Sequence, residues 1–320
     1  MSPRPLPVPP FDTELKSVLD RLKEAIPTVA LSQIAAVRAA MASPAVESLL
    51  HGRPIHHEEK TIPVPGGEIV LSTFRLSDHH PGGLGIYHVH GGGMIMGDRF
   101  SGAATYLEWV EQLDAVVVSV EYRLAPEFPD PTPVSDSYAG LLWTAAHSEE
   151  LGFDPGRLVV AGASAGAGIA AGISLKARDD DGPALAGSLL MCPMLDHRDA
   201  TTSSRQMDGV GLYDRAANKL RWRALLGTRA RTGEVSHYAS PSRAHDLSGL
   251  PPTFVDVGSA EVFRDEAVAY AARIWEQGGI AELHVWPGGF HGFDVFAPHA
   301  RLSVEARAAQ LNWLRRVVGP

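Results

Sequence analysis

From Val89 onward, apolar strand-like segments alternate with amphipathic helical segments. Two of the strand-like segments, AVVVSV (115–120) and LVVAG (158–162), are almost entirely apolar, as strands covered on both faces are. Between such segments, apolar residues recur three and four positions apart, which is typical of helices with one buried face. This alternation predicts an α/β fold with a mostly parallel sheet and helices on both of its faces.

Eight segments have strand character and five further segments have the helical period along this alternating part of the chain. The predicted strands lie within residues 59–64, 67–76, 83–90, 114–124, 156–164, 187–195, 251–259 and 281–288. The predicted helices lie within residues 103–113, 135–147, 167–179, 264–278 and 301–317.

Two regions depart from the alternation. Residues 11–42 contain two amphipathic helical patterns before any strand, and residues 196–251 contain a helix-like stretch but no convincing strand. Such an insertion is expected over the carboxyl edge of the sheet, where ligands bind in open α/β folds. We therefore expect N-terminal cap helices in residues 1–54, and one main domain in residues 55–320 with a cap insertion at about 196–240.

Composition narrows the class of protein. Hydrophobic residues make up 45% of the 320 residues, enough for a large core in one domain without disulfides. A net charge of −9 disfavours nucleic acid as a partner. The single cysteine, Cys192, lies in the apolar run GSLLMCPML, where we expect a buried, inert thiol. Without an apolar signal core at the start or a run of 18 apolar residues, we expect a cytoplasmic protein that does not enter a membrane.

The segment GASAG (162–166) joins a predicted strand to a predicted helix. It fits G-x-S-x-G, a sharp turn that exposes a nucleophilic serine, here Ser164. The overlapping glycines also fit G-x-G-x-x-A, which binds dinucleotides after a strand. A third interpretation is a tight junction in which small residues let the helix pack closely. The pentapeptide alone leaves all three open.

Two further motifs favour the first interpretation. Residues 90–93 read HGGG after a predicted strand, and such glycines expose backbone N–H groups that can bind an oxyanion. His291 lies in GGFHGF after the last predicted strand. Hydrolases with this kind of turn carry their serine, acid and histidine in that order along the chain. His291 is therefore the predicted base for Ser164.

The acid is expected near the end of the penultimate strand. The segment VDVGSAEVFRDE offers Asp256, Glu261, Asp265 and Glu266. Asp256 lies inside the strand, and the last two lie in a first helical turn, where carboxylates often only complement the helix dipole. Glu261 lies in the loop between them and is favoured, with Asp265 as its main competitor.

Taken together, HGGG (90–93), YRLAPE (122–127), GASAG (162–166) and HGF (291–293) resemble the bacterial hormone-sensitive-lipase-type (family IV) carboxylesterases. The resemblance covers residues 55–318. It implies an α/β-hydrolase fold with an eight-stranded, mostly parallel sheet, a helical cap and no cofactor. It also implies hydrolysis of short- to medium-chain esters, and in some relatives a homodimer through the last strand and helix.

The resemblance also implies roles for individual residues. Backbone N–H groups of Gly91, Gly92 and Ala165 would form the oxyanion hole. Met94 stands where an aromatic residue is common, and we expect it to shape the substrate pocket. Trp222 in the insertion is predicted either to line that pocket or to seat the cap.

Alternative functions remain at this stage. The same three residues would also hydrolyse a lactone, an amide or a carbamate, and some relatives are ligand receptors that have lost catalysis. YRLAPE is interpreted as architecture, in which Arg123 and Glu127 hold a loop by hydrogen bonds. His88 and His90 share one face of a strand without a third ligand at a suitable spacing, so no metal is expected.

Overall fold

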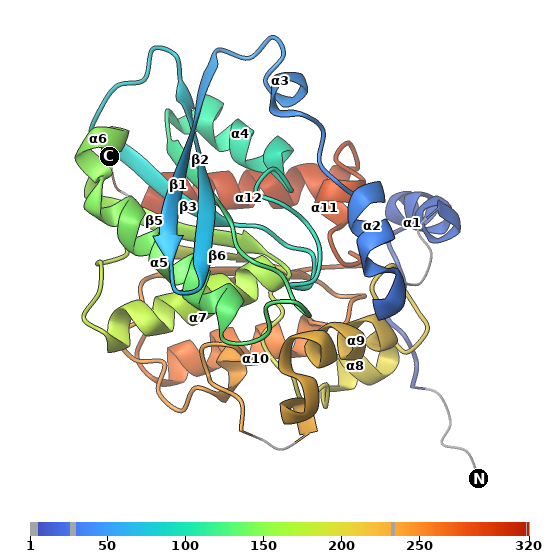
Figure 1. The fold of residues 1–320 in the computed structure, drawn as a ribbon. Coiled ribbons are helices and arrows are strands. Elements are labelled where there is room, and N and C mark those ends of the chain that lie inside the picture. Colours follow the sequence, from blue (N-terminus) through green and yellow to red (C-terminus); the bar gives the residue numbers. More distant parts are fainter. Residues whose placement is uncertain (1–5, 26–29, 232–233, 318, 320) are drawn as a thin grey trace.

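The computed structural model describes residues 6–25, 30–231, 234–317 and 319. Its centre is one eight-stranded sheet with the order β1-β2-β4-β3-β5-β6-β7-β8 (Figure 1). β2 runs antiparallel to both of its neighbours, and the other five neighbouring pairs are parallel. The strands are β1 (Ile55–Val64), β2 (Gly67–Leu76), β3 (Gly83–Val89), β4 (Val116–Glu121), β5 (Phe153–Ala163), β6 (Gly187–Met191), β7 (Thr253–Gly258) and β8 (Ala281–Trp286).

All eight predicted strands are found, and the prediction of a mostly parallel eight-stranded sheet is confirmed. The segment 187–195 is one of the differences, because β6 ends at Met191. Cys192 follows with a positive φ of 39°, which is incompatible with a continuing strand.

The larger helices cover the sheet on both faces (Figure 1). They are α4 (Ala103–Leu113), α5 (Thr132–Ala146), α7 (Ala165–Asp179), α10 (Arg264–Glu276) and α12 (Arg301–Val317). Val116 and Val118 of β4 pack into the same buried cluster as residues of α5, α7 and α10, whereas Val117 packs with α4 and α12. The alternation of side chains along a strand thus gives each sheet face its own core.

Further helices lie before the sheet and in the connections between strands. Before the sheet lie α1 (Thr13–Ala25), η1 (Leu31–Gln33), α2 (Ile34–Ala40) and α3 (Val46–Leu49). Between β6 and β7 lie α8 (Thr202–Gln206), α9 (Arg215–Leu226), η2 (Gly227–Arg231) and η3 (Pro241–Arg243). Two one-turn helices, α6 (Ser148–Leu151) and α11 (Phe293–Phe296), connect larger elements.

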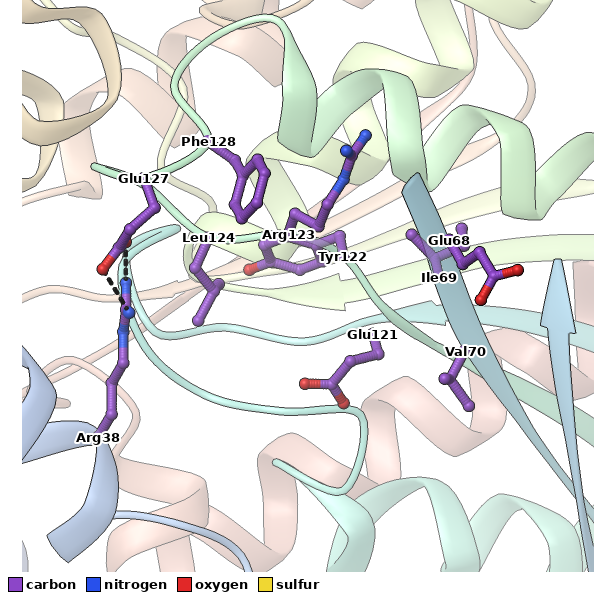
Figure 2. A pocket seen from close by; sticks show the side chains of 10 residues that line it. All are labelled: Arg38, Glu68, Ile69, Val70, Glu121, Tyr122, Arg123, Leu124, Glu127 and Phe128. Carbon is purple, nitrogen blue, oxygen red and sulfur yellow. Dashed lines mark hydrogen bonds and ion pairs between the residues drawn. The ribbon is translucent and has the colours of Figure 1, made fainter. Parts of the chain in front are cut away.

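The N-terminal helices are fastened to the main domain by Arg38 of α2. Its guanidinium donates to the carbonyl oxygens of Ile95 (2.7 Å) and Ala125 (2.8 Å) and forms an ion pair with Glu127 at 2.8 Å. Figure 2 shows this pair at the edge of a hollow of about 370 Å³ beside β2. Glu127, the last residue of YRLAPE, therefore joins two parts of the chain that are far apart in sequence.

Arg123, the second residue of that motif, holds the loop after β4. Its backbone N–H and its guanidinium all donate to the fully buried carboxylate of Asp136 in α5, at 2.7 to 3.0 Å. The same guanidinium also reaches carbonyl oxygens in the turn between β1 and β2. These contacts agree with the architectural interpretation of YRLAPE.

β8 lies at the edge of the sheet, and Val285 on it is exposed. The homodimer suggested by the family resemblance would use this edge. That dimer stays a prediction.

We expect Asp136→Asn to lower the free energy of unfolding by about 3 kcal/mol, because it leaves a largely buried guanidinium without its counter-charge. Urea unfolding followed by circular dichroism measures the change. Asp20→Asn is the matched control, since Asp20 pairs with Lys16 on an exposed face of α1 and its loss should cost less than about 0.5 kcal/mol. Equal effects of the two substitutions would contradict the role given to Asp136.

Candidate active site

Ser164 occupies a sharp turn between β5 and α7. Its backbone angles are φ 57° and ψ −120°, a strained conformation for a residue with a side chain. A Cβ atom on Gly162 would stand 2.5 Å from the carbonyl carbon of Gly166, and a Cβ on Gly166 would overlap the carbonyl oxygen of Val89. Both flanking residues of the motif therefore have to be glycine for the turn to fit between the strands.

This packing also bears on the dinucleotide interpretation. Gly166 and Gly168 face backbone oxygen atoms of Val89 and Met194 so closely that a Cβ on either glycine would overlap them. In a dinucleotide loop, such glycines instead leave room for a pyrophosphate. The glycines of α7 are thus used for close helix packing, and the dinucleotide interpretation is set aside.

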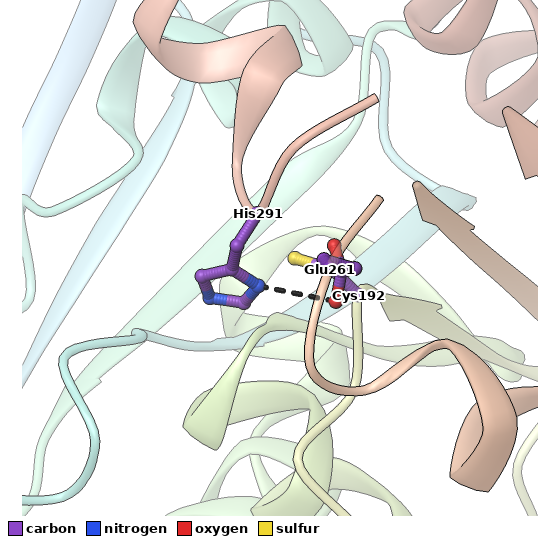
Figure 3. Close-up of side chains that lie close together, drawn as sticks. All are labelled: Cys192, Glu261 and His291. Atoms are coloured by element: carbon purple, nitrogen blue, oxygen red, sulfur yellow. Dashed lines mark hydrogen bonds and ion pairs between the residues drawn. The ribbon is translucent and has the colours of Figure 1, made fainter. Parts of the chain in front are cut away.

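The hydroxyl of Ser164 lies within hydrogen-bonding distance of His291. The Oγ atom of Ser164 is 2.9 Å from Nε2 of His291, and Nδ1 of the same ring is 3.3 Å from Oε1 of Glu261. Ser164 follows β5, Glu261 follows β7 and His291 follows β8. The carboxyl ends of three parallel strands thus bring together residues that are far apart in sequence. Figure 3 shows Glu261 and His291 projecting toward each other from two separate loops.

Of the four candidate acids, Glu261 is the one in contact with His291. Asp265 instead accepts a hydrogen bond of 2.7 Å from the backbone N–H of Ser203 in α8. Asp256 and Glu266 are buried and accept hydrogen bonds from other groups. The geometry therefore favours Glu261 over Asp265 as the partner of His291.

The carboxylate of Glu261 is almost fully enclosed. Its side chain is 1% exposed, and its second oxygen, Oε2, has no hydrogen-bond partner within the described part of the chain. Its other oxygen, Oε1, lies 3.3 Å from Nδ1 of His291, so the imidazole is the hydrogen-bond partner of this carboxylate.

The HGGG loop lies directly against the serine turn. A Cβ atom on Gly91 would stand 3.0 Å from the carbonyl oxygen of Ala163 and 3.6 Å from Cβ of Ser164. Gly92 has a positive φ of 106°, and a side chain there would overlap the carbonyl oxygen of Met96. The two glycines thus permit a backbone path that passes next to the serine.

Two neighbouring residues support this loop. His90 stacks on Tyr122 at a centroid distance of 4.1 Å, and its Nδ1 lies 2.8 Å from the carbonyl oxygen of Gly91. Ala165 is the first residue of α7, and N–H groups in a first helical turn have no acceptor within their own helix. Gly91, Gly92 and Ala165, the three predicted donors, therefore all lie around Ser164.

A cavity of about 290 Å³ opens above Ser164 and His291. Its walls come partly from the two predicted cap regions, through Met41 in the N-terminal part and Leu212, Tyr213 and Arg221 in the insertion. Further lining residues are His88, Gly93, Met96, Thr105, Trp109, Met191, Cys192, Asp294 and Phe296. Apolar side chains therefore predominate around a few polar groups, as in many small-molecule sites.

The two side chains predicted to shape the pocket lie elsewhere. Met94 has a positive φ of 61° and packs in the core, 1% exposed, while Met96 lines the cavity instead. Trp222 is 1% exposed and packs inside the insertion, so its second expected role, seating the cap, is the one that its burial supports. The preceding residue, Arg221, faces the cavity. Sequence reasoning missed Arg221 because the direction of a side chain on a short helix depends on how that helix is seated.

Cys192 lies beside Glu261 and His291, as Figure 3 shows. Its Sγ atom and one ligand atom each of Glu261 and His291 lie within 4.8 Å of one another. Burial, together with the charge of Glu261, raises the pKa of the thiol well above its usual value. Metals bind the thiolate rather than the thiol. The expectation of a buried thiol is therefore met, and its raised pKa does not favour metal binding.

Comparison with known proteins places this site in a family. The family described as the alpha/beta hydrolase fold matches residues 86–295. Esterase LipI of Mycobacterium tuberculosis is 33% identical over 73% of this chain and 72% of that protein. Carboxylesterase NlhH of the same organism is 33% identical over 73% of each chain.

Solved structures agree with the sequence relatives. A bacterial heroin esterase superposes with a TM-score of 0.88 and 34% identity, covering 97% of this chain and 98% of that one. Esterase LipW from Mycobacterium marinum superposes with a TM-score of 0.85 and 29% identity, covering 98% and 99%. The chain therefore belongs to the α/β-hydrolase family, in its hormone-sensitive-lipase-type group, and is a carboxylic ester hydrolase.

In the described residues, none of the helices has the length and apolar character that spanning a membrane requires.

A second layer of buried acids lies behind the site. Asp256 accepts hydrogen bonds from Gln310 (3.0 Å) and Trp286 (3.3 Å). Burial raises its pKa to about 7, and the nearby charge of Asp294 adds to the effect. Because the folded pKa lies above the unfolded value, the folded protein binds more protons between about pH 4 and 7. Protonated Asp256 therefore contributes to the free energy of unfolding at low pH, and this contribution is lost as the pH rises through that window.

We expect Asp256→Asn to remove this loss, because the amide keeps an acceptor for Gln310 without a charge to desolvate. Between pH 4.5 and 8, the free energy of unfolding of the variant should rise relative to that of the natural chain by about 2 to 4 kcal/mol. Urea unfolding at both pH values measures it. If the free energies of unfolding of the variant and the natural chain differ by the same amount at both pH values, a raised pKa at Asp256 is contradicted.

Proposed function

We propose that the protein is a serine carboxylesterase that hydrolyses short- to medium-chain acyl esters through Ser164, His291 and Glu261. The observation that carries the proposal is the continuous contact from Oγ of Ser164 through the imidazole to Glu261, at the base of the cavity. An activated serine nucleophile needs a base in hydrogen-bond reach and a group that orients that base. The contacts among these three residues support the proposal.

In the first half of the reaction, Nε2 of His291 takes the proton of Ser164 as Oγ attacks the ester carbonyl carbon. The carbonyl oxygen becomes an oxyanion that the backbone N–H groups of Gly91, Gly92 and Ala165 stabilise. Glu261 fixes the ring with its proton on Nδ1 and stabilises the imidazolium that forms. His291 then returns its proton to the departing alcohol, which leaves an acyl group on Ser164.

In the second half, water enters and His291 takes a proton from it as the oxygen attacks the acyl carbonyl carbon. The same backbone donors stabilise the second oxyanion. When that intermediate collapses, Oγ of Ser164 regains its proton from His291 and the carboxylic acid leaves. The strained turn keeps Oγ in one place through both halves, so little reorganisation is needed between them.

The two cap regions, residues 1–54 and about 196–240, have a role in this proposal. Met41 from the first and Leu212 and Tyr213 from the second line the cavity. They would enclose the acyl or alcohol group of the substrate, while the sheet supplies the reacting groups. The ion pair of Arg38 with Glu127 would hold the first region in position.

We expect Ser164→Ala to lower kcat for 4-nitrophenyl butyrate by at least about 10⁴-fold and Glu261→Gln by about 10² to 10⁴-fold. Steady-state hydrolysis at pH 8 measures both. Asp265→Asn is the matched control, because Asp265 contacts α8 and its loss should change kcat less than about threefold. Activity that survives Glu261→Gln but not Asp265→Asn would assign the acid to Asp265.

Covalent labelling and substrate profiling separate the other classes of function. Labelling of the folded chain by a fluorophosphonate, absent in Ser164→Ala, is expected of an enzyme and not of a ligand receptor. A protein that is labelled but turns over lactones, amides or carbamates far faster than simple esters would shift the substrate class while keeping the mechanism.

We also expect a preference for short acyl chains. A cavity of about 290 Å³ lies at the small end of ligand pockets, so acyl chains beyond octanoyl would extend outside it. Across 4-nitrophenyl esters from acetate to palmitate, kcat/KM should peak between acetyl and octanoyl and fall at least about tenfold by palmitoyl. A maximum at palmitoyl would contradict this prediction.

A further inference from the structure

Arg221 places a buried positive charge in the wall of the cavity. It belongs to α9, its side chain is 9% exposed, and it is one of the residues that line the space above Ser164 and His291. Within the described part of the chain, it is the one arginine or lysine on that wall. The enzymatic reaction proposed above does not use it.

The guanidinium has unused hydrogen-bonding capacity. Nη1 donates to the carbonyl oxygen of Ala217 at 3.0 Å, whereas Nε is buried without a partner among the described residues. Arg215 on the same helix, by contrast, forms an ion pair with Asp199 at 2.6 Å. A buried charge without a counter-charge is costly. Arg221 lies in the wall of a ligand cavity, so a negatively charged group of the ligand would offset the cost of burying its charge.

The structure also fixes where this charge lies relative to the reacting groups. The side chain of Arg221 fills the space that a Cβ atom on Gly93 would need, so the last glycine of HGGG lets it pass directly against that loop. Its Cζ atom lies 4.7 Å from the ring centroid of Tyr213, and the same ring is 4.9 Å from that of His291. One aromatic ring therefore separates the guanidinium from the imidazole.

The remaining charges around the cavity leave this cation available. Asp294 is the carboxylate among the described lining residues. Burial raises the pKa of Asp294, and no ion pair joins it to Arg221 among the described residues. The planar ring of Tyr213 supports the guanidinium on one side, which fixes its orientation. An arginine held in this way presents donors that match a carboxylate.

We propose that Arg221 binds a carboxylate of the substrate, so that the preferred esters carry a free acid group as well as the ester that is cleaved. This inference rests on the proposed esterase function and names its substrate class. Half-esters of dicarboxylic acids carry the acid on the acyl side, and esters of hydroxy acids carry it on the alcohol side. Arg221 would act by binding and orienting the substrate and would leave the chemical steps to the three residues above.

The test compares acidic esters with neutral esters of the same size. On the acyl side the pair is 4-nitrophenyl hydrogen adipate and its methyl ester, and on the alcohol side it is 4-acetoxybenzoate and its methyl ester. Each is assayed with the natural chain, Arg221→Met, which keeps an apolar stem, and Arg221→Lys, which keeps the charge. Arg223→Met, an exposed position on the same helix, is the control for a lost positive charge.

In at least one pair, the natural chain should hydrolyse the acidic ester with a kcat/KM equal to or above that of the neutral ester. Arg221→Met should lower kcat/KM for that acidic ester by about 10- to 100-fold, as expected for a lost charge-assisted hydrogen bond. Its effect on the neutral ester should stay below about threefold. Arg221→Lys should retain part of the preference, and Arg223→Met should retain all of it.

Three results would overturn the proposal. The first is a kcat/KM of the natural chain that is more than tenfold higher for the neutral ester than for the acidic ester in both pairs; this result is obtained without any variant. The second is an acidic preference that survives Arg221→Met. The third is an equal loss on acidic and neutral esters, which would make Arg221 a structural residue. Failure of the natural chain to hydrolyse any of these esters, with no fluorophosphonate labelling, would instead overturn the esterase function on which this inference rests.

Discussion

The turn at Ser164 is the constraint on which the rest of the structure depends. A serine at φ 57° stands above the sheet only because Gly162 and Gly166 let backbone atoms approach where side chains would collide. The elements on either side hold this strained turn in place, because β5 lies at the centre of the sheet and α7 is buried along most of its length. The HGGG loop, His291 and Glu261 are then arranged around one oxygen atom, Oγ of Ser164.

Much of this arrangement could be predicted from the sequence, for physical reasons. Central strands such as β4 and β6, which are buried on both faces, are almost entirely apolar and were recognisable for that reason. At residues 92, 162 and 166 a Cβ atom would overlap backbone atoms, and at residue 91 it would be in tight contact, so the pattern of these glycines is visible in sequence. Cys192 was predicted inside a strand because its neighbours are apolar, but a positive φ ends the strand before it. Apolar composition does not reveal such a turn.

The pocket walls were harder to predict, because they depend on how separate segments pack. Met94 follows HGGG and Trp222 is a large side chain in the insertion, yet both are buried in the core, and Met96 and Arg221 line the cavity instead. A rotation of one position along a short helix decides between Arg221 and Trp222. No local pattern sets that rotation. Burial of a charged residue beside a glycine with a positive φ is visible only after folding.

The order of the strands has a consequence for how the chain acquires activity during synthesis. Ser164 and the HGGG loop are made early, but His291 follows β8, the last strand to be made, which pairs at one edge of the sheet with β7. During synthesis, the segment that carries Ser164 is therefore made well before the segment that carries His291. Under the function proposed above, the hydrolytic site would be complete only once β8 has paired with β7.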